Sequence, residues 1–282
     1  MVYSRWSIAI DYGQWTSDQM NKLYIIKIGG NVLDDEQALH SFLKDFASLQ
    51  APKILVHGGG KIATKIGEQL GIESKYINGR RITDAPTRDL VTMVYGGLLN
   101  KQLTAHLQTL HCNAIGITGA DGNLLKAIKR PVGEIDYGFV GDITPNDVNS
   151  TFLYFLLKQN VTPIFAPLTH CNGEILNTNA DTIASVVAIS LSKHFDTRLI
   201  FCFEKKGVLK NINDENSVIH QLNESTYEQL LKERAIADGI LPKLENAFSA
   251  INSGVKEVLI GDAKDLIKNI RETTEGTLIT KS

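Results

Sequence analysis

The 282-residue sequence has few cysteines, almost no net charge and no long apolar run. Its cysteines, Cys112, Cys171 and Cys202, are scattered without a CxxC pair, which argues against a disulfide framework or a zinc site. The net charge of -2 excludes broad attraction to nucleic acid or to an anionic membrane. No apolar run approaches the roughly 18 residues that a membrane span needs. We therefore expect a cytoplasmic protein that recognises anions only locally.

The first 19 residues differ from the rest of the chain. They have neither the long apolar core of a secretory signal nor the Arg-rich and Ser-rich character of a transit peptide. Both tryptophans, Trp6 and Trp15, lie here, ahead of Met20, which would be a natural start for the strand that follows. We expect residues 1–19 to form an N-terminal extension of unknown role.

The stretch 23–31 is the feature around which the chain is organised. Residues 23–28 read as a strand buried on both faces, yet Lys27 lies near its end and Gly29 and Gly30 follow at once. Bare backbone at such a turn can close its N–H groups around phosphate oxygens, and a lysine beside it favours an anion. Taken alone, the same residues also fit a tight turn with a lysine that reaches solvent.

A second glycine-rich turn favours the anion-binding interpretation. Residues 53–56 read as a buried strand that runs directly into His57 and three glycines, residues 58–60. In open α/β sheets, ligands bind at the carboxyl ends of the strands, where this turn would lie. His57 suggests catalysis, but a lone histidine at a strand end is more often a hydrogen-bonded structural residue, and we favour that role.

Strands alternate with helices along the chain, which is the pattern of βαβ units on a mainly parallel sheet. Further strands are expected at 114–117, 139–143, 162–168, 198–203 and 255–261. Helices are expected at 34–50, 62–70, 86–110, 146–159, 183–191, 225–232 and 244–252, and a final polar turn at 275–277. The pair Gly96 and Gly97 predicts close packing or a bend in the long helix.

Two polar clusters remain after these elements are placed. Arg80 and Arg81 flank an Asn-Gly turn; a guanidinium there is either solvated surface charge or a bidentate grip on a substrate carboxylate. Asn177, Asn179 and Asp181 alternate just before an apolar helix. Asp181 would suit an N-cap, but three such residues together are dense for capping alone.

Taken in order, these motifs resemble those of the amino acid kinase family, from about residue 23 to residue 279. Each motif alone is a weak or moderate signal, but five in this order are a strong one, and the Asn-Gly-x-Arg-x-Thr and Asn-x-Asn-Ala-Asp motifs resemble those of the branch that acts on N-acylated glutamate. The resemblance rests on Lys27-Ile28-Gly29-Gly30, His57-Gly58-Gly59-Gly60, Asn78-Gly79-Arg80-Arg81-Ile82-Thr83, Asn177-Thr178-Asn179-Ala180-Asp181 and Asp238-Gly239-Ile240-Leu241-Pro242-Lys243.

The resemblance implies an αβα sandwich with a mainly parallel central sheet and two lobes. Residues 20–189 would bind the acylated amino acid and form a homodimer, and residues 190–282 would bind ATP. The implied reaction moves the γ-phosphoryl group of MgATP onto the side-chain carboxylate of N-acetyl-L-glutamate, or of its N-succinyl analogue, in arginine biosynthesis. Because a carboxylate is already a nucleophile, alignment and charge neutralisation would carry the catalysis.

The resemblance also assigns roles to residues. Lys27 and Lys243 would neutralise the phosphoryl oxygens, and Asp181 would hold both amines. No residue is expected to bind metal directly, since Mg²⁺ would be held mainly by the nucleotide phosphates. The remaining roles are phosphate and nucleotide binding by Gly29, Gly30, Glu204 and Gly207, and substrate binding by Gly59, Gly60, Arg81 and Asn177.

One departure from the family pattern leaves alternatives open. Relatives usually carry an aspartate and small residues where this chain has Glu204, two lysines and Gly207, so its lysines would meet either nucleotide phosphates or solvent. Arg80 is a candidate partner for a charged succinyl arm. A non-catalytic sensor of an amino acid and a nucleotide is the alternative of a different class. A sister kinase acting on carbamate, aspartate, glutamate or UMP is the alternative within the family.

Overall fold

A computed structural model describes residues 21–211, 213–232 and 240–281. The predicted extension, residues 1–19, and the first two residues of the Asp-Gly-x-x-Pro-Lys motif, Asp238 and Gly239, lie outside the described residues. Among the described residues, no helix has both the length and the apolar character that crossing a membrane requires.

An eight-stranded sheet forms the centre of the molecule, in the order β12-β14-β13-β11-β1-β2-β8-β5. Neighbouring strands are parallel except for the pair β13 and β14. The strands are β1 Lys22–Ile28, β2 Lys53–His57, β5 Ala114–Ile117, β8 Thr162–Phe165, β11 Asp196–Phe203, β12 Gln221–Leu222, β13 Glu257–Asp262 and β14 Thr277–Ile279. The expected mainly parallel sheet is confirmed.

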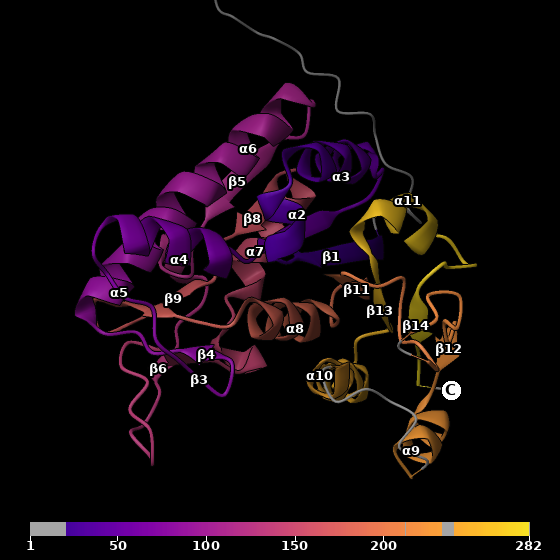
Figure 1. Cartoon of the computed structure of the whole chain (residues 1–282). Coiled ribbons are helices and arrows are strands. Elements are labelled where there is room, and N and C mark those ends of the chain that lie inside the picture. Colours follow the sequence, from indigo (N-terminus) through magenta and orange to yellow (C-terminus); the bar gives the residue numbers. More distant parts are fainter. Residues whose placement is uncertain (1–20, 212, 233–239, 282) are drawn as a thin grey trace, which may run out of the picture.

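Helices cover both faces of this sheet, which makes the αβα sandwich. Figure 1 shows α3, α6 and α11 on one side of the sheet and α8 and α10 on the other. The main helices are α3 Glu36–Ser48, α4 Gly60–Gln69, α5 Ala85–Val91, α6 Asn100–Thr109, α7 Ser150–Lys158, α8 Ala180–Leu191, α9 Glu224–Lys232 and α10 Leu241–Asn252, with the short helices α2 Gly30–Asp34 and α11 Leu266–Asn269.

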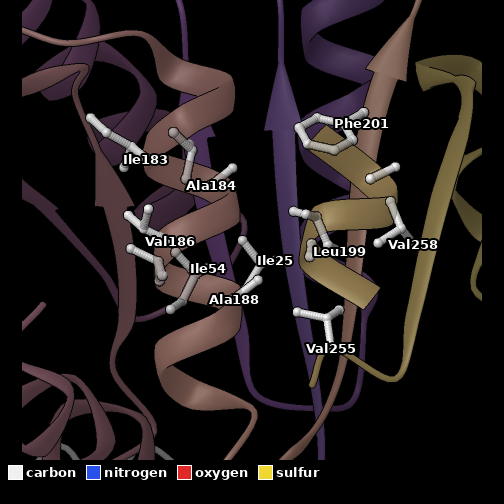
Figure 2. Packing of buried hydrophobic residues seen from close by; sticks show 14 of the residues in the cluster. Ile25, Ile54, Ile183, Ala184, Val186, Ala188, Leu199, Phe201, Val255 and Val258 are labelled. Atoms are coloured by element: carbon white, nitrogen blue, oxygen red, sulfur yellow. The ribbon is translucent and has the colours of Figure 1, made fainter. Parts of the chain in front are cut away.

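The two faces of β1 belong to different cores because side chains alternate along a strand. Ile26 and Ile28 pack into the core beneath α3 and α6, whereas Leu23 and Ile25 pack into the core beneath α8 and α10. Figure 2 shows Ile25 and Ile54 facing α8, and Leu199 and Phe201 of the neighbouring strand near α10. Lys27 continues the series of Leu23 and Ile25, so its side chain projects from the face that α8 covers.

Strand order separates the chain into an earlier and a later half. On one side of the boundary lie β1, β2, β8 and β5, and on the other lie β11, β13, β14 and β12. The boundary is the parallel pairing of β1 with β11, in which Lys27 is opposite Phe201. Residues from both halves therefore meet at the carboxyl ends of these two central strands.

Three antiparallel hairpins extend from the carboxyl edge of the earlier half. They pair β3 Tyr76–Ile77 with β4 Arg80–Arg81, β6 Ile128–Lys129 with β7 Gly141–Asp142, and β9 Leu168–Cys171 with β10 Glu174–Asn177. The first one turns at Asn78 and Gly79, both with positive φ, as the Asn-Gly pair favours. The strand expected at 139–143 is present as the shorter β7, whereas the pairing of the strands into hairpins was not predicted.

Several predicted boundaries are wrong for identifiable reasons. The strand expected at 162–168 is two strands, β8 and β9, divided at Pro167, which has no N–H for a ladder bond. The helix expected at 146–159 starts at Ser150, because the Asn149 side chain caps it. Thr277, expected in a polar turn, begins β14. The long helix expected at 86–110 contains a π-helical segment, Thr92–Leu99, which includes Gly96 and Gly97.

Candidate functional site

A lysine from each half of the chain meets one aspartate at the carboxyl end of the sheet. Lys27 Nζ lies 2.8 Å from Asp181 Oδ1, and Lys243 Nζ lies 2.9 Å from Asp181 Oδ2. The three side chains are between 13% and 19% exposed. We call Lys27, Asp181 and Lys243 the lysine–aspartate cluster. The structure thus brings together the three residues predicted to be catalytic.

The cluster keeps Asp181 ionised. Burial alone would raise the pKa of its carboxyl group, and burial is the largest single influence on it. The charges of Lys27 and then Lys243, with their hydrogen bonds, together outweigh burial and hold the pKa below its ordinary value. At neutral pH the cluster carries two positive charges and one negative charge, so it has one positive charge left for an anion.

The start of α8 explains how Asp181 is free to bind the lysines. The N-cap is Asn179, whose Oδ1 accepts a hydrogen bond from the backbone N–H of Thr182 at 3.0 Å. Asp181 is the second residue of the helix, since α8 begins at Ala180, earlier than the predicted residue 183. Asp181 is therefore not the cap, and the helix dipole further favours its negative charge.

The two glycine turns lie side by side next to the cluster. Gly29 follows β1 and is the N-cap of α2, and Gly59 follows β2 and is the N-cap of α4. The Gly58 N–H donates to the Ile28 carbonyl at 3.0 Å, which ties the turns together. Gly59 has φ +149°, and a Cβ there would lie 2.5 Å from Leu99 Cδ1, so only glycine fits.

His57 supports the second glycine turn, and its imidazole ring is uncharged at neutral pH. Its Nδ1–H donates to the Gly58 carbonyl at 2.7 Å, which leaves Nε2 to accept from Asn100 Nδ2 at 3.3 Å. The ring is fully buried, and burial lowers its pKa to about 4 despite the bond to Gly58. Asn100 also donates to the Ile164 carbonyl of β8 at 2.8 Å. The predicted structural role of His57 is confirmed.

A cleft of about 550 Å³ opens on one side of the lysine–aspartate cluster. We call it the main cleft. Among the residues predicted from sequence, its lining includes Gly59, Gly60, Arg81, Asn177, Asp181 and Lys243. The main cleft therefore joins the predicted substrate-binding residues to two of the predicted catalytic ones.

Arg81 is held firmly in the wall of the main cleft. It is 7% exposed, its Nη2 donates to the Gly60 carbonyl at 2.8 Å and to Thr64 Oγ1 at 3.0 Å, and its Nη1 donates to Ser74. Its guanidinium also stacks on the ring of Tyr76, 4.8 Å from the centroid. Arg81 is thus fixed to the second glycine turn, and Arg80, its exposed neighbour, lines the same cleft.

The lining of the main cleft also includes Asn177, which was predicted from the sequence, and Arg130, which was not. Asn177 Nδ2 donates to Thr83 Oγ1 at 3.1 Å. Arg130 lines the same cleft. It directly follows β6 and forms a forked ion pair with Asp142 on the partner strand, β7. No local sequence signal marks Arg130, because its partner Asp142 is twelve residues away and the pairing of β6 with β7 was not predicted.

A second, smaller pocket of about 190 Å³ lies on the other side of the cluster. We call it the glycine pocket; it is lined by Lys27, Gly29, Gly30, Asn31, Val32, Cys202, Phe203, Glu204 and Lys243. Lys243 lines both the glycine pocket and the main cleft. The cluster therefore stands where the two spaces meet.

The predicted nucleotide residues of the later half separate in the structure. Glu204 lines the glycine pocket, but Gly207 is buried against β14, where a Cβ would lie 2.7 Å from Thr277 Oγ1. Close packing thus accounts for this glycine without a ligand. Lys205 pairs with Glu215 at 3.2 Å, and the Lys205 side chain is partly exposed and that of Glu215 largely exposed. Among the residues that the structure describes, no group of three or more His, Cys, Asp or Glu side chains could hold a metal ion.

Fold and site together define a class of protein. Glycine turns at the carboxyl edge of a parallel sheet, beside two lysines on a buried carboxylate, suit an enzyme that transfers phosphoryl groups. The sequence profile described as the amino acid kinase family matches residues 22–262. The chain belongs to this family.

Individual relatives narrow the comparison. The chain is 55% identical to the acetylglutamate kinase of Cytophaga hutchinsonii over 261 residues, which cover 92% of this chain and 98% of that protein. It is 53% identical to the acetylglutamate kinase of Parabacteroides distasonis, over 88% of this chain and 96% of the relative. Among solved structures, smu.665 of Streptococcus mutans matches with a TM-score of 0.71 and 29% identity, over 92% of this chain and 99% of that one.

Proposed function

We propose that this protein transfers the γ-phosphoryl group of MgATP to the side-chain carboxylate of N-acetyl-L-glutamate, forming an acyl phosphate in arginine biosynthesis. The observation that carries the proposal is that Lys243 lines both the main cleft and the glycine pocket and is bound to Asp181, which lines the main cleft. An acceptor in the cleft and a nucleotide in the pocket would face each other across two ammonium groups. The names of the relatives supply the substrate.

The chemistry asked of the chain is positioning and charge neutralisation. The acceptor carboxylate needs no general base, because it already carries the attacking oxygen as an anion. Lys27 and Lys243 would approach the transferring phosphoryl group from opposite halves of the chain. Asp181 would keep the two ammonium groups near each other, since they would otherwise repel. Groups of this kind typically contribute about 2 to 4 kcal/mol each to the transition state.

The acylated amino acid would lie in the main cleft. Arg81 would bind its α-carboxylate through its positive charge and the N–H donors that Gly60, Thr64 and Ser74 leave free, in a plane that stacking on Tyr76 fixes. Asn177, which lines the same cleft, would bind the N-acyl arm. Backbone N–H groups at Gly59 and Gly60 would complete the grip near the attacking oxygen.

The nucleotide phosphates would lie against Gly29 and Gly30 in the glycine pocket. Mg²⁺ would come with ATP and neutralise the phosphate charge, held mainly by the phosphates themselves. The chemistry of the donors fits this assignment, because Glu204 is the one carboxylate among the described residues that line the pocket, and Asp181 is already bound to two ammonium groups. Glu204 lines the pocket. Within the turn 204–207, where this chain differs from the family pattern, it is the residue best placed to contact the nucleotide.

The acyl arm is a finer question than the reaction itself. N-succinyl-L-glutamate is the second substrate to consider, since Arg80 is exposed and lines the main cleft, where it could meet the extra carboxylate. We retain both arms as substrates to be tested, with acetyl placed first because the relatives are named for it.

We further propose a division of labour between the halves of the sheet. Residues 20–189 would bind the acylated amino acid and form a homodimer, and residues 190–282 would bind ATP. The strand order supports this division, since the earlier and later residues occupy opposite sides of the pairing of β1 with β11. We place the reaction in the cytoplasm.

Nucleotide consumption with a panel of acceptors tests the proposal. Release of ADP should depend on N-acetyl-L-glutamate or its succinyl analogue and should be absent with carbamate, aspartate, glutamate or UMP. Turnover with one of the latter instead would identify a sister kinase. Tight binding of MgATP with no turnover on any acceptor would favour the non-catalytic sensor.

A further inference from the structure

Two aromatic rings lie beneath the ammonium group of Lys243. Its Nζ is 5.8 Å from the ring centroid of Phe201 and 5.6 Å from that of Phe203. Both distances fall within the roughly 6 Å over which the negative face of an aromatic ring attracts a cation. The same ammonium group lies 2.9 Å from Asp181 Oδ2.

The sequence Phe201-Cys202-Phe203 places the rings where they are. Side chains two apart on a strand share one face of the sheet, so both rings project from β11 toward α8 and α10. Figure 2 shows Phe201 on this face, beside α10. Phe201 is 1% exposed and belongs to the core, whereas Phe203 is half-buried and lines the glycine pocket.

We infer that Phe203 is a positioning residue for Lys243 in phosphoryl transfer. An ammonium group has three N–H donors, and Asp181 accepts one of them. A carboxylate or carbonyl in place of the ring would accept another. The ring attracts the charge through its face, so it holds the ammonium group near Asp181 and leaves the remaining donors to phosphoryl oxygens. This inference rests on the proposed function, because it assigns Lys243 to that reaction.

A double-mutant cycle in unfolding tests the contact without using enzyme activity. The variants are Phe203→Leu, Lys243→Met and the double variant, compared with the unchanged protein by urea unfolding at one protein concentration. The ion pair with Asp181 is lost in both the Lys243→Met variant and the double variant, so its contribution cancels in the coupling free energy. We expect a coupling of about 3- to 10-fold in the unfolding equilibrium constant. Coupling indistinguishable from zero would overturn the contact on which the inference depends.

A series of fluorinated phenylalanines at position 203 tests the catalytic consequence. Each added fluorine weakens the negative ring face while the ring size stays nearly constant. We expect kcat to fall stepwise from phenylalanine to its trifluoro form, by about 3- to 10-fold in total, while the KM for ATP stays constant. A flat kcat across the series would mean that Phe203 only fills space.

Two further variants separate positioning from packing. Phe203→Tyr keeps a ring face and should retain most of the activity, whereas Phe203→Leu keeps apolar volume and should lose as much kcat as the trifluoro form. Phe155→Leu, at an exposed ring on α7, is the matched control and should change nothing. A rise in the KM for ATP at constant kcat would contradict the inference and make Phe203 a nucleotide contact.

The outcomes also separate the inference from the proposed function. Absence of turnover by the unchanged protein, together with coupling in the unfolding cycle, would contradict the proposed function and leave the Lys243 contact established. Normal turnover with no coupling and a flat fluorination series would contradict the inference alone.

Discussion

Lys243 Nζ lies 2.9 Å from Asp181 Oδ2, although the two residues are 62 positions apart and lie in the first turns of different helices. This pair joins the later half of the chain to the earlier one at the carboxyl edge of the sheet. Lys27, near the end of β1, binds the other oxygen of the Asp181 carboxylate. A charge cluster built from three elements can neutralise phosphoryl oxygens only while all three elements hold it together.

Asp181→Asn should abolish most turnover while the fold persists. The amide keeps the shape of the side chain but cannot neutralise two ammonium groups, which would then move apart. We expect the initial rate of acyl phosphate formation to fall about 100-fold or more. Asp196→Asn is the matched control, because Asp196 pairs with Lys256 on the exposed surface. Equal losses in the two variants would remove Asp181 from the catalytic role.

Lys27→Ala should reduce kcat by a similar factor, roughly 100-fold. Because Lys27 and Asp181 act as one unit, the double variant with Asp181→Asn should lose much less than the product of the two single losses. Steady-state kinetics of the three variants measures this. Losses that multiply fully would show that the two residues act independently.

Arg81→Lys should weaken binding of the acylated amino acid. The substitution keeps the positive charge but removes the planar fork that binds Gly60, Thr64 and Ser74 and that would bind a carboxylate. We expect the KM for the acylated glutamate to rise about 10- to 100-fold, with the KM for ATP nearly constant. A change confined to the KM for ATP would show that Arg81 contacts ATP and not the acylated glutamate.

Arg80→Ala should discriminate between acyl arms. Arg80 is exposed at the main cleft, so its loss matters only if the substrate carries an extra carboxylate there. We expect the KM for N-acetyl-L-glutamate to stay within about twofold and that for the succinyl analogue to rise about 5- to 10-fold. Identical effects on both substrates would rule out Arg80 as the partner of a charged arm.

His57 should make the folded state weaker in mild acid. Its pKa falls from 6.5 to about 4 on folding, so below pH 6.5 the unfolded chain takes up a proton that the folded chain refuses. Stability is therefore full above pH 6.5 and is lost as the pH falls toward 4. Between pH 7 and pH 5 the free energy of unfolding should drop by about 2 kcal/mol. His57→Gln should lower stability at pH 7 and lack this part of the pH dependence, as urea unfolding at both pH values would measure.

Much of the fold was predictable because buried parallel strands leave a strong local signal. The runs 23–28 and 53–56 are apolar apart from Lys27 and Lys53, glycines follow each within two residues, and the structure has β1 and β2 there. The hairpin strands β3 and β4 are two residues each, with Tyr76 and Ile77 exposed, so no apolar pattern marks them. Their pairing depends on the turn at Asn78 and Gly79 and on distant contacts such as that of Arg81 with the Gly60 carbonyl, 21 residues away in the sequence.

The site was predictable in its residues more than in its contacts. A glycine turn and a charge at a strand end indicate Gly59 and Lys27, and the dense polar cluster ahead of an apolar helix indicates Asp181. The capping role of Asn179 was not distinguished from that of Asp181, since both residue types cap helices well. Gly207 lies in a charged turn typical of a ligand-binding loop, but it packs against Thr277 of β14. That contact depends on the tertiary structure and leaves no local sequence signal.

Trapping the product with hydroxylamine tests the central claim most directly. Purified protein is incubated with MgATP and either N-acetyl-L-glutamate or N-succinyl-L-glutamate, and the hydroxamate that forms from an acyl phosphate is measured alongside ADP. Transfer to a carboxylate predicts hydroxamate in one-to-one ratio with ADP for at least one of the two substrates, and its loss in Asp181→Asn. ADP release without hydroxamate, or no reaction with either acylated glutamate, would contradict the proposed function.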